Sequence, residues 1–129
     1  MRKEIFVLPI PSSWLNSPKF HEGHRRKSEI ICEYESDTGR CVRLSLFFEN
    51  TYAVKITYHL ANDARIIPMA YDKVVDLGDT DWLTGIKSTI ASNQGSYVDL
   101  RHFAIFFDDG PLYEFVCKSF YAEESPAKV

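Results

Sequence analysis

The chain has 129 residues, which is enough for one domain built around one hydrophobic core. Apolar residues make up 45% and charged residues 26%, the balance of an ordinary soluble globular protein. The formal net charge of −3 argues against general nucleic-acid binding, which requires a basic face. No apolar run approaches the ~18 residues of a membrane span, and no signal-peptide pattern is present, so we expect a cytoplasmic protein without a membrane partner.

The N-terminal third predicts one strand followed by a hairpin. Residues 3–8 (KEIFVL) form an apolar run that Pro9 and Pro11 end. Residues 19–28 are dense in charge, and we expect a surface loop or a short helix there. Residues 29–35 and 41–49 alternate between apolar and polar side chains around a glycine-containing turn at 36–40, which is the pattern of two paired strands.

The middle of the chain predicts a third clear strand and one helix. Residues 51–60 alternate strictly, and residues 65–69 suggest a short edge strand ended by Pro68. The helix should begin near 79–81, where Thr80 or an aspartate can cap it, and should end at 93–95. Its apolar face would contain Trp82, Leu83, Ile86 and Ile90.

The last quarter carries the strongest structural signal. Two aromatic and β-branched runs flank residues 108–111 (DDGP), and Asp-Gly between such runs is typical of a hairpin turn. Tyr113, Phe115 and Cys117 should point into the core. Glu114 and Lys118, which alternate with them, should face solvent, with Arg101 or His102 on the facing strand as partners. From residue 123 onward we expect a loose polar tail.

These elements predict one α+β domain over residues 1–129. We expect a mostly antiparallel curved sheet, or a partly open barrel, of about six strands with one main helix packed on it.

The cysteines and glycines exclude several site types. The three cysteines are odd in number and none are spaced as CxxC, so we predict no disulfide framework, no zinc site and no cofactor. We expect all three to be small buried side chains, although Cys41 beside Arg40 is the one thiol with electropositive surroundings. Neither a nucleophile motif nor a phosphate-binding glycine loop is present.

Two acidic groups are candidates for contact with a basic protein partner. One group surrounds the helix start and the other occupies the last hairpin turn. Aspartates at such positions more often serve as turn and cap residues, so that role competes with partner binding. The candidate contact residues are Asp72, Asp76, Asp79, Asp81, Asp108 and Asp109.

An alternative site would lie in a pocket between helix and sheet. His21 and His24 are spaced HxxH, which could hold a metal on a helix, but the flanking proline and glycine make a stable helix doubtful. Solvated histidines are therefore favoured over a metal site. The candidate pocket residues are His21, His24, Tyr58 and His59.

Two stretches carry a resemblance to known proteins. Residues 18–22 (PKFHE) are similar to the Phe-His-Asp opening of a group of small bacterial α+β proteins, and residues 113–120 (YEFVCKSF) resemble the aromatic-and-cysteine last strand of that group. Many of these proteins are treated as immunity proteins that neutralise toxins of neighbouring cells. The resemblance implies inhibition by tight protein binding, without catalysis or cofactor.

Our leading hypothesis is therefore a non-enzymatic, cytoplasmic protein-binding domain. The alternative is a small enzyme or ligand-binding domain with a pocket between helix and sheet. A structural subunit that assembles through an exposed strand edge is a third possibility, and the oligomeric state is left open.

Overall fold

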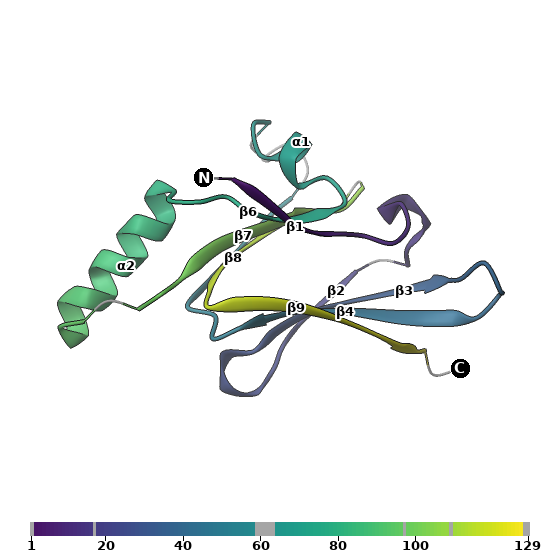
Figure 1. Ribbon diagram of the computed structural model, residues 1–129, viewed down its shortest axis with the longest axis horizontal. Coiled ribbons are helices and arrows are strands. Elements are labelled where there is room, and N and C mark those ends of the chain that lie inside the picture. The colour runs from purple at the N-terminus through teal and green to yellow at the C-terminus, as the bar shows by residue number, and fades with distance from the viewer. Residues whose placement is uncertain (1, 17, 59–63, 97, 109, 128–129) are drawn as a thin grey trace.

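The computed structural model describes residues 2–16, 18–58, 64–96, 98–108 and 110–127. Within these ranges the chain forms nine strands in two antiparallel sheets that lie one above the other (Figure 1). We call the five-stranded sheet, with strand order β1-β6-β7-β8-β5, sheet A, and the four-stranded sheet, with order β2-β3-β4-β9, sheet B. Sheet A contains β1 (Lys3–Val7), β5 (Ala53–Thr57), β6 (Lys73–Asp76), β7 (Arg101–Phe106) and β8 (Leu112–Cys117). Sheet B contains β2 (Lys19–Glu22), β3 (Ser28–Glu35), β4 (Cys41–Glu49) and β9 (Ser119–Pro126).

The helical elements are few. The main helix is α2 (Asp81–Gln94), and α1 (Ile67–Ala70) is a single turn. Two short 3₁₀ turns, η1 (Ser12–Trp14) and η2 (His24–Arg26), complete the described part of the chain. None of the helices described is long and apolar enough to cross a membrane.

This architecture confirms part of the predicted fold. The α+β class, the antiparallel strands and the single main helix are all present. The prediction of one sheet with about six strands is wrong, because the strands divide into two sheets, and these sheets are not closed into a barrel. Alternation identifies which side chains of a strand share a face, but it does not identify which strands share a sheet.

The core fills the space between the two sheets, because each sheet turns one apolar face toward the other. Phe48 of β4 and Phe115 of β8 are completely buried, and their rings stack across the interface with centroids 3.9 Å apart. The predicted inward positions of the last hairpin, Tyr113, Phe115 and Cys117, all belong to this core. From sheet B the core receives Ile30, Cys32, Leu44, Leu46 and Phe48.

Helix α2 forms as its end signals predict. The Thr80 hydroxyl accepts a hydrogen bond from the backbone N–H of Leu83 (3.3 Å), which caps the first turn. Gly95 ends the helix with φ = +78°, a conformation that glycine adopts without strain. Leu83 is buried in one cluster with Leu100 and with Val116 of β8, and Figure 1 shows α2 at one side of the two sheets.

Three local predictions need correction. Residues 65–69 do not form a strand, since α1 begins at Ile67 and Pro68 occupies its first turn, where proline needs no hydrogen-bond donor. Residues 19–22 form strand β2 instead of a loop or helix, because Phe20 packs on Tyr113 and Phe115 of the opposite sheet. The tail is also ordered, because β9 pairs with β4 as far as Pro126.

The chain crosses between the sheets at one corner of the molecule. One residue, Lys118, separates β8 in sheet A from β9 in sheet B, and its N–H donates to the carbonyl of Glu49 (2.9 Å). The segment between β4 and β5 crosses at the same corner, where the N–H of Tyr52 donates to the carbonyl of Val116 (2.8 Å). A buried hydrogen bond between the Ser28 and Thr51 hydroxyls (3.1 Å) reinforces this corner.

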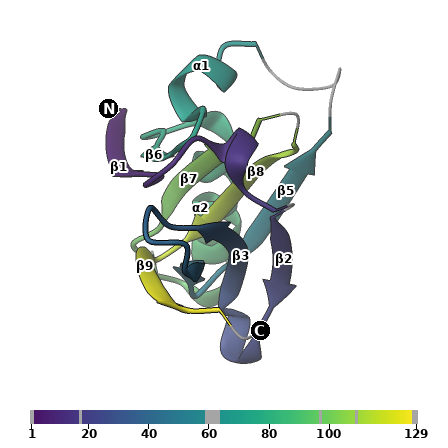
Figure 2. The same ribbon diagram turned by 90° about the vertical axis from the view of Figure 1, so that its right-hand side faces the viewer.

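A segment that we call the strap, residues 8–16, also connects the two sheets, because it runs from β1 in sheet A toward β2 in sheet B (Figure 2). On the sheet A side, the N–H of Ser12 donates to Asp72 Oδ2 (3.2 Å), and the Ser12 hydroxyl accepts from the N–H of Asp108 (2.7 Å). On the sheet B side, the N–H of Asn16 donates to the carbonyl of Glu33 (3.0 Å). The strap therefore holds both sheets through its backbone and one serine.

Candidate functional site

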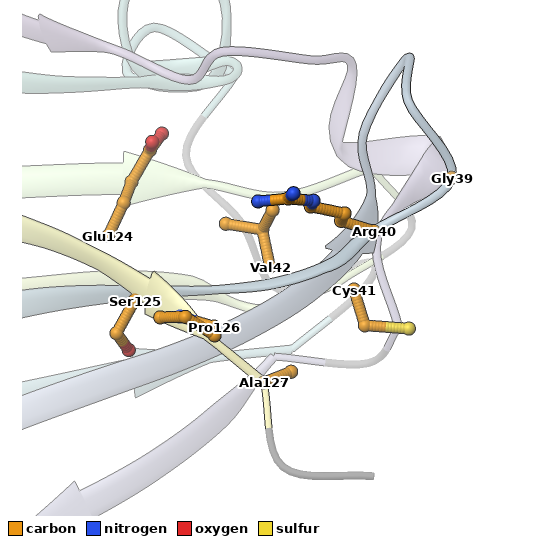
Figure 3. A pocket seen from close by; sticks show the side chains of 8 residues that line it. All are labelled: Gly39, Arg40, Cys41, Val42, Glu124, Ser125, Pro126 and Ala127. Atoms are coloured by element: carbon orange, nitrogen blue, oxygen red, sulfur yellow. The ribbon is translucent and has the colours of Figure 1, made fainter.

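A surface hollow lies where the β3–β4 hairpin meets the end of β9 (Figure 3). It is open to solvent and has a volume of about 660 Å³. Figure 3 shows the Arg40 side chain extending above Val42, with the Glu124 carboxylate on the same side. We call this hollow the hairpin-end groove; its lining residues are Gly39, Arg40, Cys41, Val42, Glu124, Ser125, Pro126 and Ala127.

Local backbone geometry builds the groove. The hairpin turn closes through hydrogen bonds from Ser36 N–H to the Arg40 carbonyl (2.8 Å) and from Gly39 N–H to the Ser36 carbonyl (2.9 Å). Gly39 has φ = +78°, so the turn requires glycine at this position. Strand β9 then places Pro126 opposite Val42 and ends the pairing with a hydrogen bond from Ala127 N–H to the Cys41 carbonyl (3.0 Å).

A second hollow of about 300 Å³ shares the lining residues Cys41 and Ala127 with the groove. Its wall includes Trp14, which belongs to the strap and is 71% exposed, more than any other large apolar side chain in the described ranges. An exposed tryptophan next to a wide, partly apolar groove is typical of a protein-interaction surface, where tryptophan is enriched. No motif in the sequence marks Trp14 as a site residue, and the nearby Pro11 and Pro18 indicate only that it lies in an irregular segment.

The cysteines differ in accessibility. Cys32 and Cys117 are buried, and burial raises the pKa of each thiol to about 12. Cys41 is exposed and lines the groove beside Arg40. The prediction that all three are buried is therefore wrong for Cys41, because it is the first residue of β4 and lies at the open end of the sheet.

Three of the six predicted contact aspartates have partners inside the molecule. Asp72 has φ = +58° and accepts from Ser12, and the buried Asp76 forms an ion pair with Arg101 (3.1 Å). Asp108 accepts from the Tyr71 hydroxyl (2.6 Å). Asp79 and Asp81 are exposed, whereas Asp109 lies outside the described residues.

The structure describes three of the four predicted pocket residues, and these lie on different segments of the chain. His21 lies on β2 and His24 on η2, and both are exposed. Tyr58 follows β5 and is 68% exposed. His59 lies outside the described residues. No group of three or more histidine, cysteine, aspartate or glutamate side chains in the described ranges is placed to hold a metal ion.

Instead, a different polar cluster lies on the outer face of sheet A, at the start of α2. Glu114 and His102 are each 3% exposed, and His102 Nε2 lies 3.0 Å from Glu114 Oε1. His102 Nδ1 lies 2.7 Å from the Thr80 hydroxyl. The prediction that His102 or Arg101 would accompany Glu114 was correct for His102, but the prediction that Glu114 faces solvent is wrong. The alternation correctly placed Glu114 on the outer face of sheet A. It could not predict that α1 and α2, which are distant from Glu114 in the sequence, pack on this face.

Comparison of the chain with protein-family models, with curated proteins and with solved structures found no match.

Proposed function

We propose that this chain is a non-enzymatic protein-binding domain that receives its partner at the hairpin-end groove. The observation that carries the proposal is Trp14, which is 71% exposed and lies next to the groove. Covering a large exposed aromatic side chain by a partner lowers the free energy of the complex, and such side chains supply much of the affinity in known interfaces.

The surroundings of Trp14 suit an extended partner segment. Strand β9 is an outer strand of sheet B in the described sheet order, so one of its backbone edges is available for pairing with another strand. Val42 and Pro126 offer apolar contact, and Arg40 and Glu124 offer one charge of each sign to orient the partner. The groove therefore combines backbone pairing, an aromatic anchor and charge selection.

The groove is favoured over the predicted acidic surface. Asp72, Asp76 and Asp108 are engaged within the fold, which leaves two described acids of that set, Asp79 and Asp81, exposed. The resemblance to immunity-type proteins supports a toxin domain of the same genome as the partner, met in the cytoplasm. The partner would then be encoded beside this chain, and co-expression should protect cells from it.

The test uses the single exposed cysteine. A photo-crosslinker attached to Cys41 should capture the product of the neighbouring gene when the two are co-expressed. In a binding titration with that product, Trp14→Ala should weaken affinity by roughly 30-fold, the loss of about 2 kcal/mol expected for an anchor residue. Tyr58→Ala removes an equally exposed aromatic side chain elsewhere and should leave affinity unchanged.

Two outcomes would contradict the proposal. One is equal affinity of the Trp14→Ala variant and the natural chain. The other is a loss of affinity for Tyr58→Ala or for Asp79→Asn, which would place the interface on a different surface.

A further inference from the structure

Another pocket opens on the outer face of sheet A, between α1 and the start of α2. It has a volume of about 320 Å³, the size of a small metabolite site. We call it the polar pocket; its lining residues are Arg2, Lys55, Arg65, Ile66, Met69, Leu77, Thr80, Asp81, His102 and Glu114.

The floor of the polar pocket is a connected hydrogen-bond chain. Thr80, His102 and Glu114 are linked through both ring nitrogens of the imidazole, at 2.7 Å and 3.0 Å. The His102 ring also makes a T-shaped contact with Trp82, with ring centroids 4.9 Å apart. The Thr80 hydroxyl is fixed in turn by the N–H of Leu83. The floor is therefore a rigid polar surface that does not have to reorganise when a ligand arrives.

This floor interrupts an otherwise apolar layer. Ala104 and Val116, which lie on the same outer face of β7 and β8, are completely buried. A buried histidine–carboxylate pair contributes little net stability compared with apolar side chains of similar volume. Stability alone thus does not explain why polar residues occupy positions 102 and 114. Binding of a polar ligand in the pocket above them would explain it.

The charges around the opening are predominantly positive. Lys55 is the cross-strand neighbour of Glu114, and its ammonium group lies 4.4 Å from the centre of the Trp82 ring. Arg2 and Arg65 also line the pocket. Among the described lining residues, two carboxylates accompany these cations, Glu114 on the floor and Asp81 on the rim.

We propose that the polar pocket binds a small organic anion that carries a carboxylate or phosphate group. The anionic group meets Lys55 and Arg2, hydroxyl or amino groups of the ligand meet the Glu114 and His102 floor, and the apolar part lies against Ile66 and Met69. This ligand site is separate from the hairpin-end groove, so the proposal of an anion site does not depend on the proposed protein partner.

Trp82 provides a built-in reporter for the test. The chain has two tryptophans, so the exposed Trp14 is first replaced by phenylalanine, which leaves Trp82 as the only indole. Inorganic phosphate and acetate are titrated separately at constant ionic strength, while Trp82 fluorescence and backbone amide shifts are followed. We expect saturable changes at Thr80, Trp82 and His102 with at least one anion. The comparison of phosphate with acetate identifies which anionic group the pocket prefers.

Charge variants make the test specific. Lys55→Gln should weaken anion binding by roughly fivefold, the upper range for one exposed charge. Glu114→Gln keeps a hydrogen-bond acceptor for His102 but removes the floor's negative charge, so it should tighten anion binding. Lys118→Gln removes an exposed lysine outside the pocket and should have no effect.

Linear, non-saturable responses to both anions would overturn the proposal. So would equal affinities of Lys55→Gln and Lys118→Gln in folded protein. Thermal unfolding of each variant shows whether it is folded before the titration is interpreted.

Discussion

The buried pair of Glu114 and His102 gives the most specific stability prediction. Glu114→Ala removes the carboxylate that lies 3.0 Å from His102 Nε2 and leaves that nitrogen buried without a partner. An unsatisfied buried neutral donor costs about 1–3 kcal/mol, and a broken buried ion pair costs about 3–5 kcal/mol. We therefore expect the free energy of unfolding to fall by about 3 kcal/mol, a large share of the 5–15 kcal/mol typical of a domain.

Two further variants separate the hydrogen bond from the loss of a side chain. Glu114→Gln retains an acceptor oxygen and should cost about 1 kcal/mol. Glu123→Ala removes an exposed glutamate from β9 and should change stability by less than about 0.5 kcal/mol.

Urea unfolding followed by tryptophan fluorescence measures these differences. With an m-value of about 2 kcal/mol per molar urea, a loss of 3 kcal/mol lowers the midpoint by about 1.5 M. If Glu114→Ala unfolds at the same midpoint as Glu123→Ala, or if glutamine proves as costly as alanine, the account of a satisfied buried pair is refuted.

Three other predictions concern the thiols, the glycines of α2 and the core. At pH 8, Ellman's reagent should modify one thiol of the folded protein, Cys41, and all three after unfolding; rapid reaction of a second thiol in the folded state would contradict the assigned burial. Gly85→Ala should raise the free energy of unfolding by about 1 kcal/mol, because the position is helical and an added Cβ meets no atom within 4 Å. Gly95→Ala should lower it by about 1 kcal/mol because φ is +78°, and a shared sign for the two in urea unfolding would contradict this reasoning. Phe48→Ala should cost about 4 kcal/mol and Phe47→Ala, on the partly exposed outer face, clearly less; equal midpoints would place the core elsewhere.

Local sequence signals were sufficient for elements whose ends are chemically marked. The cap at Thr80 and the glycine at 95 define α2, and the Asp-Gly signal at 108–111 correctly predicted that the flanking strands β7 and β8 pair. These signals act over a few residues, so one sequence is enough to interpret them.

The features that the sequence did not predict depend on contacts between residues far apart in the chain. Strand β2 exists because Phe20 finds two aromatic rings of the opposite sheet, and Glu114 is buried because helices from elsewhere in the chain cover its face. The groove depends on the meeting of the β3–β4 hairpin with the chain's last strand. None of these encounters leaves a periodic pattern in the sequence.

The strap has a consequence for how a partner would act on the whole molecule. The crossings at Lys118 and at residues 50–52 lie at the Glu49 end of β4, whereas the strap crosses near its Cys41 end, where the hairpin-end groove lies, about 27 Å away for a strand of this length. Without the strap, a change in the angle between the sheets would be smallest at the Glu49 end and largest near the groove.

Near that far end, the sheets are joined by the strap through Ser12 and Asn16. Trp14 lies between these two attachment points. A partner that binds Trp14 therefore also restrains the strap. We expect the two sheets to become more rigid relative to each other as the groove is occupied. Slower amide exchange in β3 and in residues 8–16 would be the signature of that mechanical coupling.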